Sequence, residues 1–291
     1  MSESRADNVW EYEEWGYNEA IITGYNGDET DVTVPEKIGG VTVTHIGAKA
    51  FYKKNITSVT FPDSLRGIGA SAFENCGELA EIRSLNPDVV LGLCQFKGCH
   101  RLADEKGFLI VQNHLFEYCG NEKDVVIPEN VEVICESAFE NDRNITSVIF
   151  PEALSIIRDN AFLNCANLSS LEFRSYPLTL GACVFKNCPK LIDENGFIFV
   201  GKTLCEYTGD RHTVAIPEGV EEIAPKVFSD KSELVCVSLP STLYKLYSLT
   251  FVNCPKLSSV KMVQDTVIEE DAFFNCPGIV DENGFITFGR G

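Results

Sequence analysis

Hydrophobic residues recur along the chain with a period of 22–23 residues, and one phenylalanine marks each of nine repeats. The marker positions are Phe51, Phe73, Phe96, Phe139, Phe162, Phe185, Phe228, Phe251 and Phe273. An aliphatic residue stands five positions before every marker, and another follows five or six positions after it. A unit this short cannot bury its own apolar side chains. The pattern therefore predicts a solenoid in which equivalent side chains of successive coils stack.

A longer repeat groups these nine units in threes. It is marked by the run Asp-Glu-x-Gly-Phe, which begins at Asp104, Asp193 and Asp281, positions 89 and 88 residues apart. We therefore expect an N-terminal lead-in or cap at residues 1–14 and a single solenoid at residues 15–280. Residues 281–291 then read as the start of a truncated fourth copy.

Short strands and tight turns are the elements that the pattern predicts. Residues 56–61 combine β-branched and aromatic side chains, and residues 145–150 and 168–173 repeat that composition. Two apolar segments joined by two residues containing Asn or Gly predict a β-hairpin at 108–118 and another at 197–207. The segment before each marker phenylalanine is rich in small residues and predicts a bend or a single helical turn. The expected fold is a mainly β solenoid of stacked short parallel strands with inserted β-hairpins.

The repeat resembles that of the BspA-like leucine-rich repeat family, whose unit has the form Ile-Gly-x-x-Ala-Phe-x-x-Cys-x-x-Leu-x-x-Ile. Residues 68–82 match this form closely, as do residues 157–173, and the resemblance covers nearly the whole chain from about residue 20. It implies a leucine-rich repeat solenoid and a bacterial protein, often exposed at the cell surface, that takes part in adhesion or protein binding. The resemblance carries over no catalytic residues.

Two functions are open at this point. The first is a non-enzymatic protein-interaction or adhesion module that binds a protein, or a glycan, through an extended repeat surface. The second is a structural spacer or stalk segment of a larger surface protein. No titratable cluster stands outside the repeat, so we expect neither enzyme activity nor a cofactor. We expect the chain to be a monomer.

The net charge of −19 narrows the range of partners. It argues against nucleic acid, whose phosphates require clustered Lys and Arg, and against anionic membrane surfaces. The chain has no run of 18 apolar residues, so we expect no membrane insertion. The localisation stays open. The resemblance implies the cell surface or secretion, whereas an N-terminus without a signal peptide and many unpaired cysteines fit the cytoplasm.

Serine and threonine recur where the predicted strands begin, and further polar residues lie between inward-facing positions. These residues form the candidate binding face: Thr57, Ser58, Thr60, Thr146, Ser147, Ser169, Ser170, Glu172, Ser238, Ser258, Ser259 and Lys261. One interpretation is a flat hydrogen-bonding surface for a protein or glycan. The other is an ordinary solvated face of residues that favour strands.

Cysteine placement follows the repeat. Six of the twelve cysteines stand three residues after a marker phenylalanine, at Cys76, Cys99, Cys165, Cys188, Cys254 and Cys276. We expect them to be reduced thiols that pack in the core, with disulfides between neighbouring coils as the alternative. The two pairs with four residues between them, Cys94/Cys99 and Cys183/Cys188, follow the repeat and so do not indicate zinc. No histidine recurs at a matching position as the base of a catalytic cysteine, so we predict neither a metal site nor a catalytic site. An asparagine precedes five of the six, and its side chain is expected to satisfy backbone groups in the bend.

Two further motifs have alternative interpretations. The segment 10–15 joins both tryptophans to three glutamates, and it fits either a cap over the first coil or an aromatic patch for a partner. The Asp-Glu pairs of the long repeat could be calcium ligands, but a turn followed by a left-handed glycine is the simpler interpretation.

Overall fold

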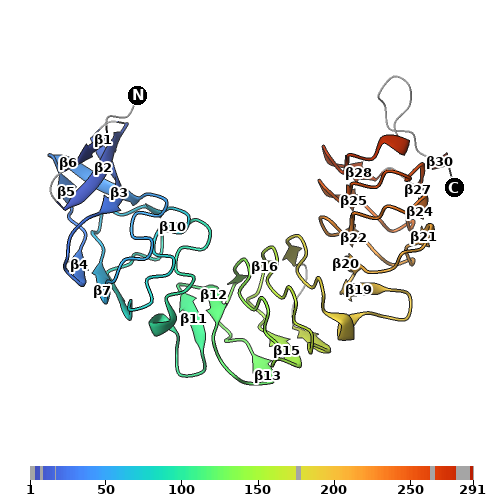
Figure 1. Cartoon of the computed structure of the whole chain (residues 1–291), viewed down its shortest axis with the longest axis horizontal. Helices are drawn as coiled ribbons and strands as arrows, with labels where there is room; N and C mark the ends of the chain where they lie inside the picture. The colour runs from blue at the N-terminus through green and yellow to red at the C-terminus, as the bar shows by residue number, and fades with distance from the viewer. Residues whose placement is uncertain are drawn as a thin grey trace. The chain divides into compact units, whose positions relative to one another are not determined.

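The computed structural model describes residues 4–6, 9–16, 18–174, 178–262, 266–279 and 289–290 (Figure 1). Its contacts divide the chain into two compact units. Unit 1 comprises Met1–Asn121 with Val133–Ala138, and unit 2 comprises Glu122–Glu132 with Phe139–Gly291. In both units the chain winds in coils whose short strands pair in parallel with those of the next coil. This confirms the predicted β solenoid with inserted hairpins. The division into 1–14, 15–280 and 281–291 stays a prediction, and Asp281 to Phe288 lie outside the described residues.

Unit 1 contains two sheets built on ladders of coil strands, and a separate hairpin. The first sheet has the order β1 (Ser4–Ala6), β2 (Trp10–Trp15), β3 (Glu19–Tyr25), β6 (Val41–Ile46), β8 (Gly67–Ile68) and β10 (Val90–Leu91), with β5 (Lys37–Ile38) paired to β6. Within it, β1–β2, β2–β3 and β5–β6 pair antiparallel. The second sheet is β4 (Asp31–Thr33), β7 (Ser58–Thr60) and β9 (Glu81–Arg83). The hairpin consists of β11 (Phe108–Val111) and β12 (His114–Tyr118), and β12 pairs in parallel with β14 (Val133–Ile134).

Unit 2 repeats this arrangement. One ladder is β13 (Asp124–Val126), β15 (Ser147–Phe150) and β17 (Ser170–Phe173), and β16 (Ile156–Ile157) pairs with β18 (Thr179–Leu180). The hairpin of β19 (Phe197–Val200) and β20 (Thr203–Tyr207) continues into β22 (Glu222–Ile223), β25 (Lys245–Leu246) and β28 (Val267–Ile268). Two further ladders are β21 (Thr213–Ala215), β24 (Cys236–Ser238), β27 (Ser259–Met262) and β30 (Gly289–Arg290), and β23 (Phe228–Ser229), β26 (Phe251–Val252) and β29 (Phe273–Phe274).

Helical structure is confined, in the described ranges, to three short 3-10 turns. These are η1 (His100–Leu102), η2 (Pro189–Leu191) and η3 (Pro277–Ile279), and each follows the third unit of a long repeat. Both predicted hairpins are present. Phe108 lies opposite Tyr118 and Phe197 lies opposite Tyr207, and both hairpins carry a register shift at the same position.

The marker phenylalanines stack in files inside each unit, as the repeat predicts. In unit 1 the rings of Phe51 and Phe73 have centroids 4.6 Å apart, and Phe73 lies 5.4 Å from Phe96. In unit 2 the stacked ring pairs are Phe139–Phe162, Phe162–Phe185, Phe228–Phe251 and Phe251–Phe273, with centroid distances of 4.6, 5.4, 4.8 and 4.9 Å. These rings are buried. Burial of their apolar area and ring stacking both stabilise the contact between successive coils.

Each marker phenylalanine lies at the centre of a bend that contains two residues with left-handed backbone conformation. All nine units have a positive φ both two residues before and two residues after the marker, as at Lys49 and Lys53 around Phe51. The amide groups of Lys49, Phe51 and Lys53 all donate to carbonyls of the next coil, at 3.1, 2.8 and 3.0 Å. The bend is therefore a hydrogen-bonded ladder. It matches the predicted bend between strands and uses no helical turn.

The left-handed position after the phenylalanine explains the recurrent asparagine. Asn and Asp adopt this conformation at lower cost than other side chains that have a Cβ atom. In unit 2 the amide of Asn187 donates to Asn164 at 2.8 Å, and Asn164 donates to Asn141 at 2.8 Å. Asn253 donates to Asp230 in the same way, also at 2.8 Å. The expectation that these side chains satisfy backbone groups was wrong: the amides of Asn164, Asn187, Asn253 and Asn275 donate to side chains of the neighbouring coil, and that of Asn75 donates to Glu74.

Of the two N-terminal tryptophans, Trp10 caps the first coil and Trp15 lies on the surface. The ring of Trp10 is nearly buried against Tyr25 and Phe51, with centroids 4.9 and 6.1 Å apart, and so covers the first phenylalanine of the file. Trp15 lies on the surface with its edge toward His45.

The Asp-Glu turns also follow the simpler interpretation. Asp104 accepts the amides of Lys106 and Phe108, both at 2.9 Å, ahead of a hairpin that starts after left-handed Gly107.

Candidate functional site

The predicted binding face is divided among three ladders. Thr57, Ser58 and Thr60 lie in or just before β7 of unit 1. In unit 2, one group lies along β15 and β17 and another along β24 and β27. The first group is Thr146, Ser147, Ser169, Ser170 and Glu172; the second is Ser238, Ser258, Ser259 and Lys261. Within each ladder these residues are neighbours in register, for example Ser147 beside Ser170 and Ser238 beside Lys261.

Most of the hydroxyl groups at the strand starts are used inside the protein. Thr57 donates to the carbonyl of Thr30 in the preceding coil at 3.1 Å, and Ser169 donates to Thr146 in the same way at 3.1 Å. Ser258 makes the equivalent bond to Val235 at 3.4 Å. Hydroxyls committed to coil-to-coil bonds have less capacity for a ligand. Their recurrence has a structural cause, and a binding role for this face stays a prediction.

An apolar groove in unit 2 is a surface that the sequence analysis missed. It lies where one sheet ends at β18 and the next begins at β19, and has a volume of about 350 Å³. Its lining residues are Leu178, Leu180, Val200, Lys202, Thr203, Glu221, Glu222 and Tyr244. Tyr244 is 51% exposed and places an aromatic ring beside the groove. An ion pair of Lys202 and Glu221 lies among the lining residues, with 2.5 Å between Nζ and Oε1.

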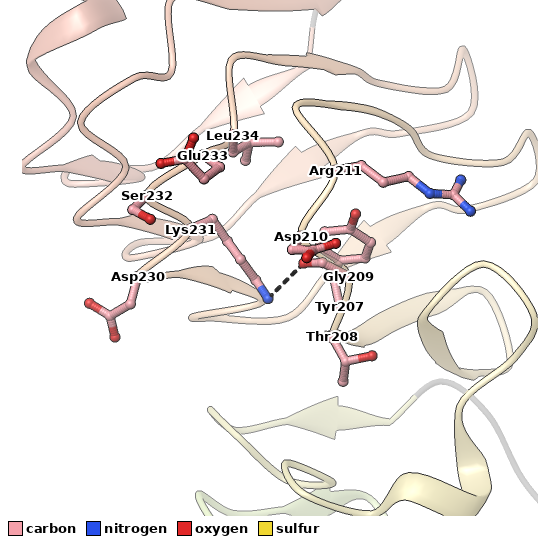
Figure 2. A pocket seen from close by; sticks show the side chains of 10 residues that line it. All are labelled: Tyr207, Thr208, Gly209, Asp210, Arg211, Asp230, Lys231, Ser232, Glu233 and Leu234. Atoms are coloured by element: carbon pink, nitrogen blue, oxygen red, sulfur yellow. Dashed lines mark hydrogen bonds between the residues drawn. The ribbon is translucent and has the colours of Figure 1, made fainter.

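A second, smaller pocket of about 190 Å³ lies at the end of the β19–β20 hairpin (Figure 2). Lys231 crosses its floor, donates to the carbonyl of Gly209 at 3.2 Å and lies over the Tyr207 ring at 5.0 Å. Arg211 extends away from Lys231. Burial lowers the pKa of Lys231. The pocket is smaller than the 300 Å³ or so that ligand sites usually occupy, and its lysine serves the fold.

The Tyr-x-Gly motif, which contributes Tyr207 and Gly209 to this pocket, has a steric cause. A Cβ atom placed on Gly209 would collide with the hydroxyl of Tyr207, and the equivalent collision occurs at Gly120 with Tyr118 and at Gly27 with Tyr25. Only glycine therefore allows the tyrosine ring to continue the phenylalanine file. In the unit after each such tyrosine, the position three residues beyond the phenylalanine is Lys54, Asp142 or Lys231, where the other six units have cysteine.

The six repeat cysteines have a common hydrogen bond. The thiol of each donates to the carbonyl of the marker phenylalanine in the preceding coil, at 2.9 Å for Cys76, 3.0 Å for Cys99 and 3.1 Å for Cys188. In the three coils that follow a Tyr-x-Gly segment this position is not cysteine, and in one of them Lys231 donates to the carbonyl of Gly209 instead. All twelve cysteines are free thiols, and these six are buried. They have the structural role that their place in the repeat predicts.

Three of the remaining cysteines, Cys119, Cys183 and Cys205, have raised pKa values, with burial as the largest cause. Burial raises the pKa of Cys205. It also raises the pKa of Cys119 to about 11, with a further contribution from the carboxylate of Glu117. A thiol with a raised pKa is a poor nucleophile at neutral pH, because the thiolate is the reactive form. These environments therefore supply no activation of the kind that a catalytic cysteine requires.

Stacked coils, a ladder of bends and a file of phenylalanines together define a leucine-rich repeat protein. The model of the BspA type leucine rich repeat region matches residues 30–106, 109–197 and 194–280, in six copies. The chain belongs to this family. No curated protein matches it. Among the described residues, no helix has the length and apolar character needed to cross a membrane.

Several bacterial proteins of known structure are similar to the chain. A leucine rich cell surface protein from Faecalibacterium prausnitzii is 22% identical over 96% of this chain and 87% of its own, with a TM-score of 0.44. A leucine rich repeat protein from T. pallidum is 29% identical over 66% and 92%, with a TM-score of 0.43. A leucine-rich repeat protein from Bacteroides ovatus is 23% identical over 95% and 81%, with a TM-score of 0.42.

Proposed function

We propose that the chain is a non-enzymatic protein-binding module that holds an extended segment of a partner in the groove beside Tyr244. The family supports a role in protein interaction or adhesion. The observation that carries the proposal is the juxtaposition of two sheet ends with apolar side chains. Leu180 of β18 and Val200 of β19 line the same groove. A strand at a sheet end presents backbone N–H and C=O groups, to which an extended peptide adds as a further strand.

The composition of the groove indicates the kind of segment it would bind. Leu178, Leu180 and Val200 provide apolar contact, and the exposed ring of Tyr244 provides a rigid aromatic anchor of the type common at binding hot spots. Lys202 pairs with Glu221 in the lining, so Glu222 provides the remaining charge of the groove, in a chain of net charge −19. We expect a segment in which apolar residues alternate with basic ones. The alternative role, a spacer or stalk, requires no such groove.

Peptide display tests this proposal without a known partner. We expect a library of random peptides, panned on the purified chain, to yield apolar and basic sequences that bind at least about tenfold more weakly to Tyr244→Asp, as for loss of a hot-spot side chain. The matched control is Val126→Asp. Val126 lies in the same unit and is 52% exposed, but it is not among the residues that line the groove. The proposal fails if no peptide is enriched, which favours the spacer, or if the peptides bind both variants equally.

A further inference from the structure

Three side chains with different donor atoms converge at the end of the β11–β12 hairpin in unit 1. They are His100 in η1, Glu117 in β12 and Cys119 immediately after β12. One nitrogen, one oxygen and one sulfur from them all lie within 4.8 Å of one another. Nε2 of His100 is 3.3 Å from Oε2 of Glu117. Two ligands bound to one ion at about 2.0–2.1 Å in a tetrahedron are about 3.3 Å apart, so this pair already has the spacing of metal ligands.

Backbone contacts fix the position of each of these groups. The amide of Cys119 donates to the carbonyl of Gly107 at 2.8 Å and closes the hairpin. The amide of Gly98 donates to Oε2 of Glu117 at 2.8 Å, in the manner of the outer contacts that orient metal-binding carboxylates. His100 follows Cys99, whose thiol is bonded to the carbonyl of Phe73. The convergence therefore follows from the coil geometry.

Of these three residues, His100 and Cys119 are not repeated at the equivalent positions of the other copies. The positions equivalent to His100 are Pro189 and Pro277, and the positions equivalent to Cys119 are Asn26 and Thr208. Residues whose side chains build the core recur from copy to copy, as the marker phenylalanines do. His100 and Cys119 do not recur, so the repeat does not account for them. Spacing along the sequence does not reveal this group, because the donors come from two different coils.

We propose that His100, Glu117 and Cys119 bind a zinc ion. Thiolate, imidazole and carboxylate are the protein ligands of zinc, and three of them leave a fourth tetrahedral position for water. Calcium and magnesium prefer oxygen donors only, and a site with nitrogen and sulfur excludes them. On binding, the S–H bond of Cys119 breaks, a sulfur–zinc bond forms and the proton passes to solvent. The ion would join η1 to the end of the hairpin.

The site is open to solvent, as binding of an ion from solution requires. The side chain of His100 is 61% exposed and that of Glu117 is partly exposed. Cys119 is also exposed; all twelve cysteines lie in the described ranges, and the others are buried or intermediate. This difference provides a specific readout, because Cys119 is the thiol that an alkylating reagent reaches most easily.

Titration of the untagged, chelator-treated chain with Co²⁺ and Zn²⁺ tests the proposal. We expect one equivalent of Co²⁺ to produce a thiolate-to-cobalt charge-transfer absorption, and Zn²⁺ to displace it. Zinc should also protect Cys119 from alkylation at alkaline pH, where more of this thiol is ionised, as measured on that peptide by mass spectrometry. Cys119→Ser should abolish the absorption, and His100→Ala should weaken binding by roughly tenfold or more.

Cys236→Ser provides the matched control, because Cys236 is a partly exposed thiol in β24 and should leave the absorption unchanged. Circular dichroism of each variant verifies that it is folded. Absence of a charge-transfer band in the folded wild-type chain would overturn the proposal. A band that survives in Cys119→Ser would do so as well, since it would assign the thiolate to another cysteine.

Discussion

Replacing Phe162 with alanine lowers the free energy of unfolding of unit 2 by about 3–5 kcal/mol, the range for a large aromatic residue removed from a core. The ring is fully buried between Phe139 and Phe185, and its edge contacts Phe150 with centroids 5.8 Å apart. Alanine would leave a cavity in the middle of the file. Urea unfolding followed by far-ultraviolet circular dichroism measures the change. Tryptophan fluorescence does not, because both tryptophans lie in unit 1.

Phe274→Ala is the matched control for this variant. Phe274 directly follows a marker phenylalanine in the same unit, but it is 52% exposed. Its replacement should change the stability by no more than about 0.5 kcal/mol, as is usual for surface sites. Equal losses for Phe162→Ala and Phe274→Ala would show that stacking along the file does not hold the coils together.

Replacing Glu206 with glutamine stabilises the chain at pH 8 and has little effect at pH 5. Glu206 is a buried carboxylic acid in β20, and burial raises its pKa from 4.5 to about 7 against the opposing charges of Lys186 and Lys231. Between these two values the folded state binds more protons than the unfolded state, so stability falls as the pH rises. The difference of about 2.5 between the two pKa values corresponds to a loss of about 3 kcal/mol in the free energy of unfolding above pH 7. Glutamine stays neutral and should therefore avoid this loss.

Unfolding by urea at pH 5, 6, 7 and 8 measures this effect. The stability difference between Glu206→Gln and the wild-type chain should grow with pH and level off above the folded-state pKa. Glu152→Gln, at an exposed site in the same unit, removes one negative charge as well and should give no pH-dependent difference. A flat difference for Glu206→Gln, or a loss of stability at pH 8, would contradict the assignment of a costly buried carboxylate.

The repeat predicts most of the fold because every coil imposes the same requirements. Phe162 and its equivalents must be apolar, and they stack as their spacing predicts. The hairpins are visible in sequence because two apolar segments flank a distinctive two-residue turn. The hydrogen-bonded ladder of bends is harder to predict from the sequence. Its left-handed positions hold residues as different as Lys49, Leu249 and Asn164, so backbone bonds rather than side-chain preference determine the conformation there.

Surfaces are harder to predict from the repeat than the core. The Ser and Thr rows recur in sequence because they bond from coil to coil, as Ser169 does to Thr146, and recurrence alone does not indicate a ligand. The groove beside Tyr244 and the donors around Cys119 form where hairpins interrupt the stack. Such places depend on contacts between residues that are distant in sequence. The informative signal was the departure from the repeat, at His100 and Cys119, and not the repeat itself.

The central claim is that equivalent side chains of successive coils contact one another. Nuclear Overhauser spectra of a deuterated chain with protonated phenylalanine rings test it directly, with assignments from single Phe→Leu variants. We predict cross-peaks from the ring of Phe162 to the rings of both Phe139 and Phe185, whose centroids lie 4.6 and 5.4 Å away. The rings of Phe139 and Phe185, separated by Phe162, should give no cross-peak with each other. A Phe162 ring without cross-peaks to either neighbour would contradict the stacked arrangement.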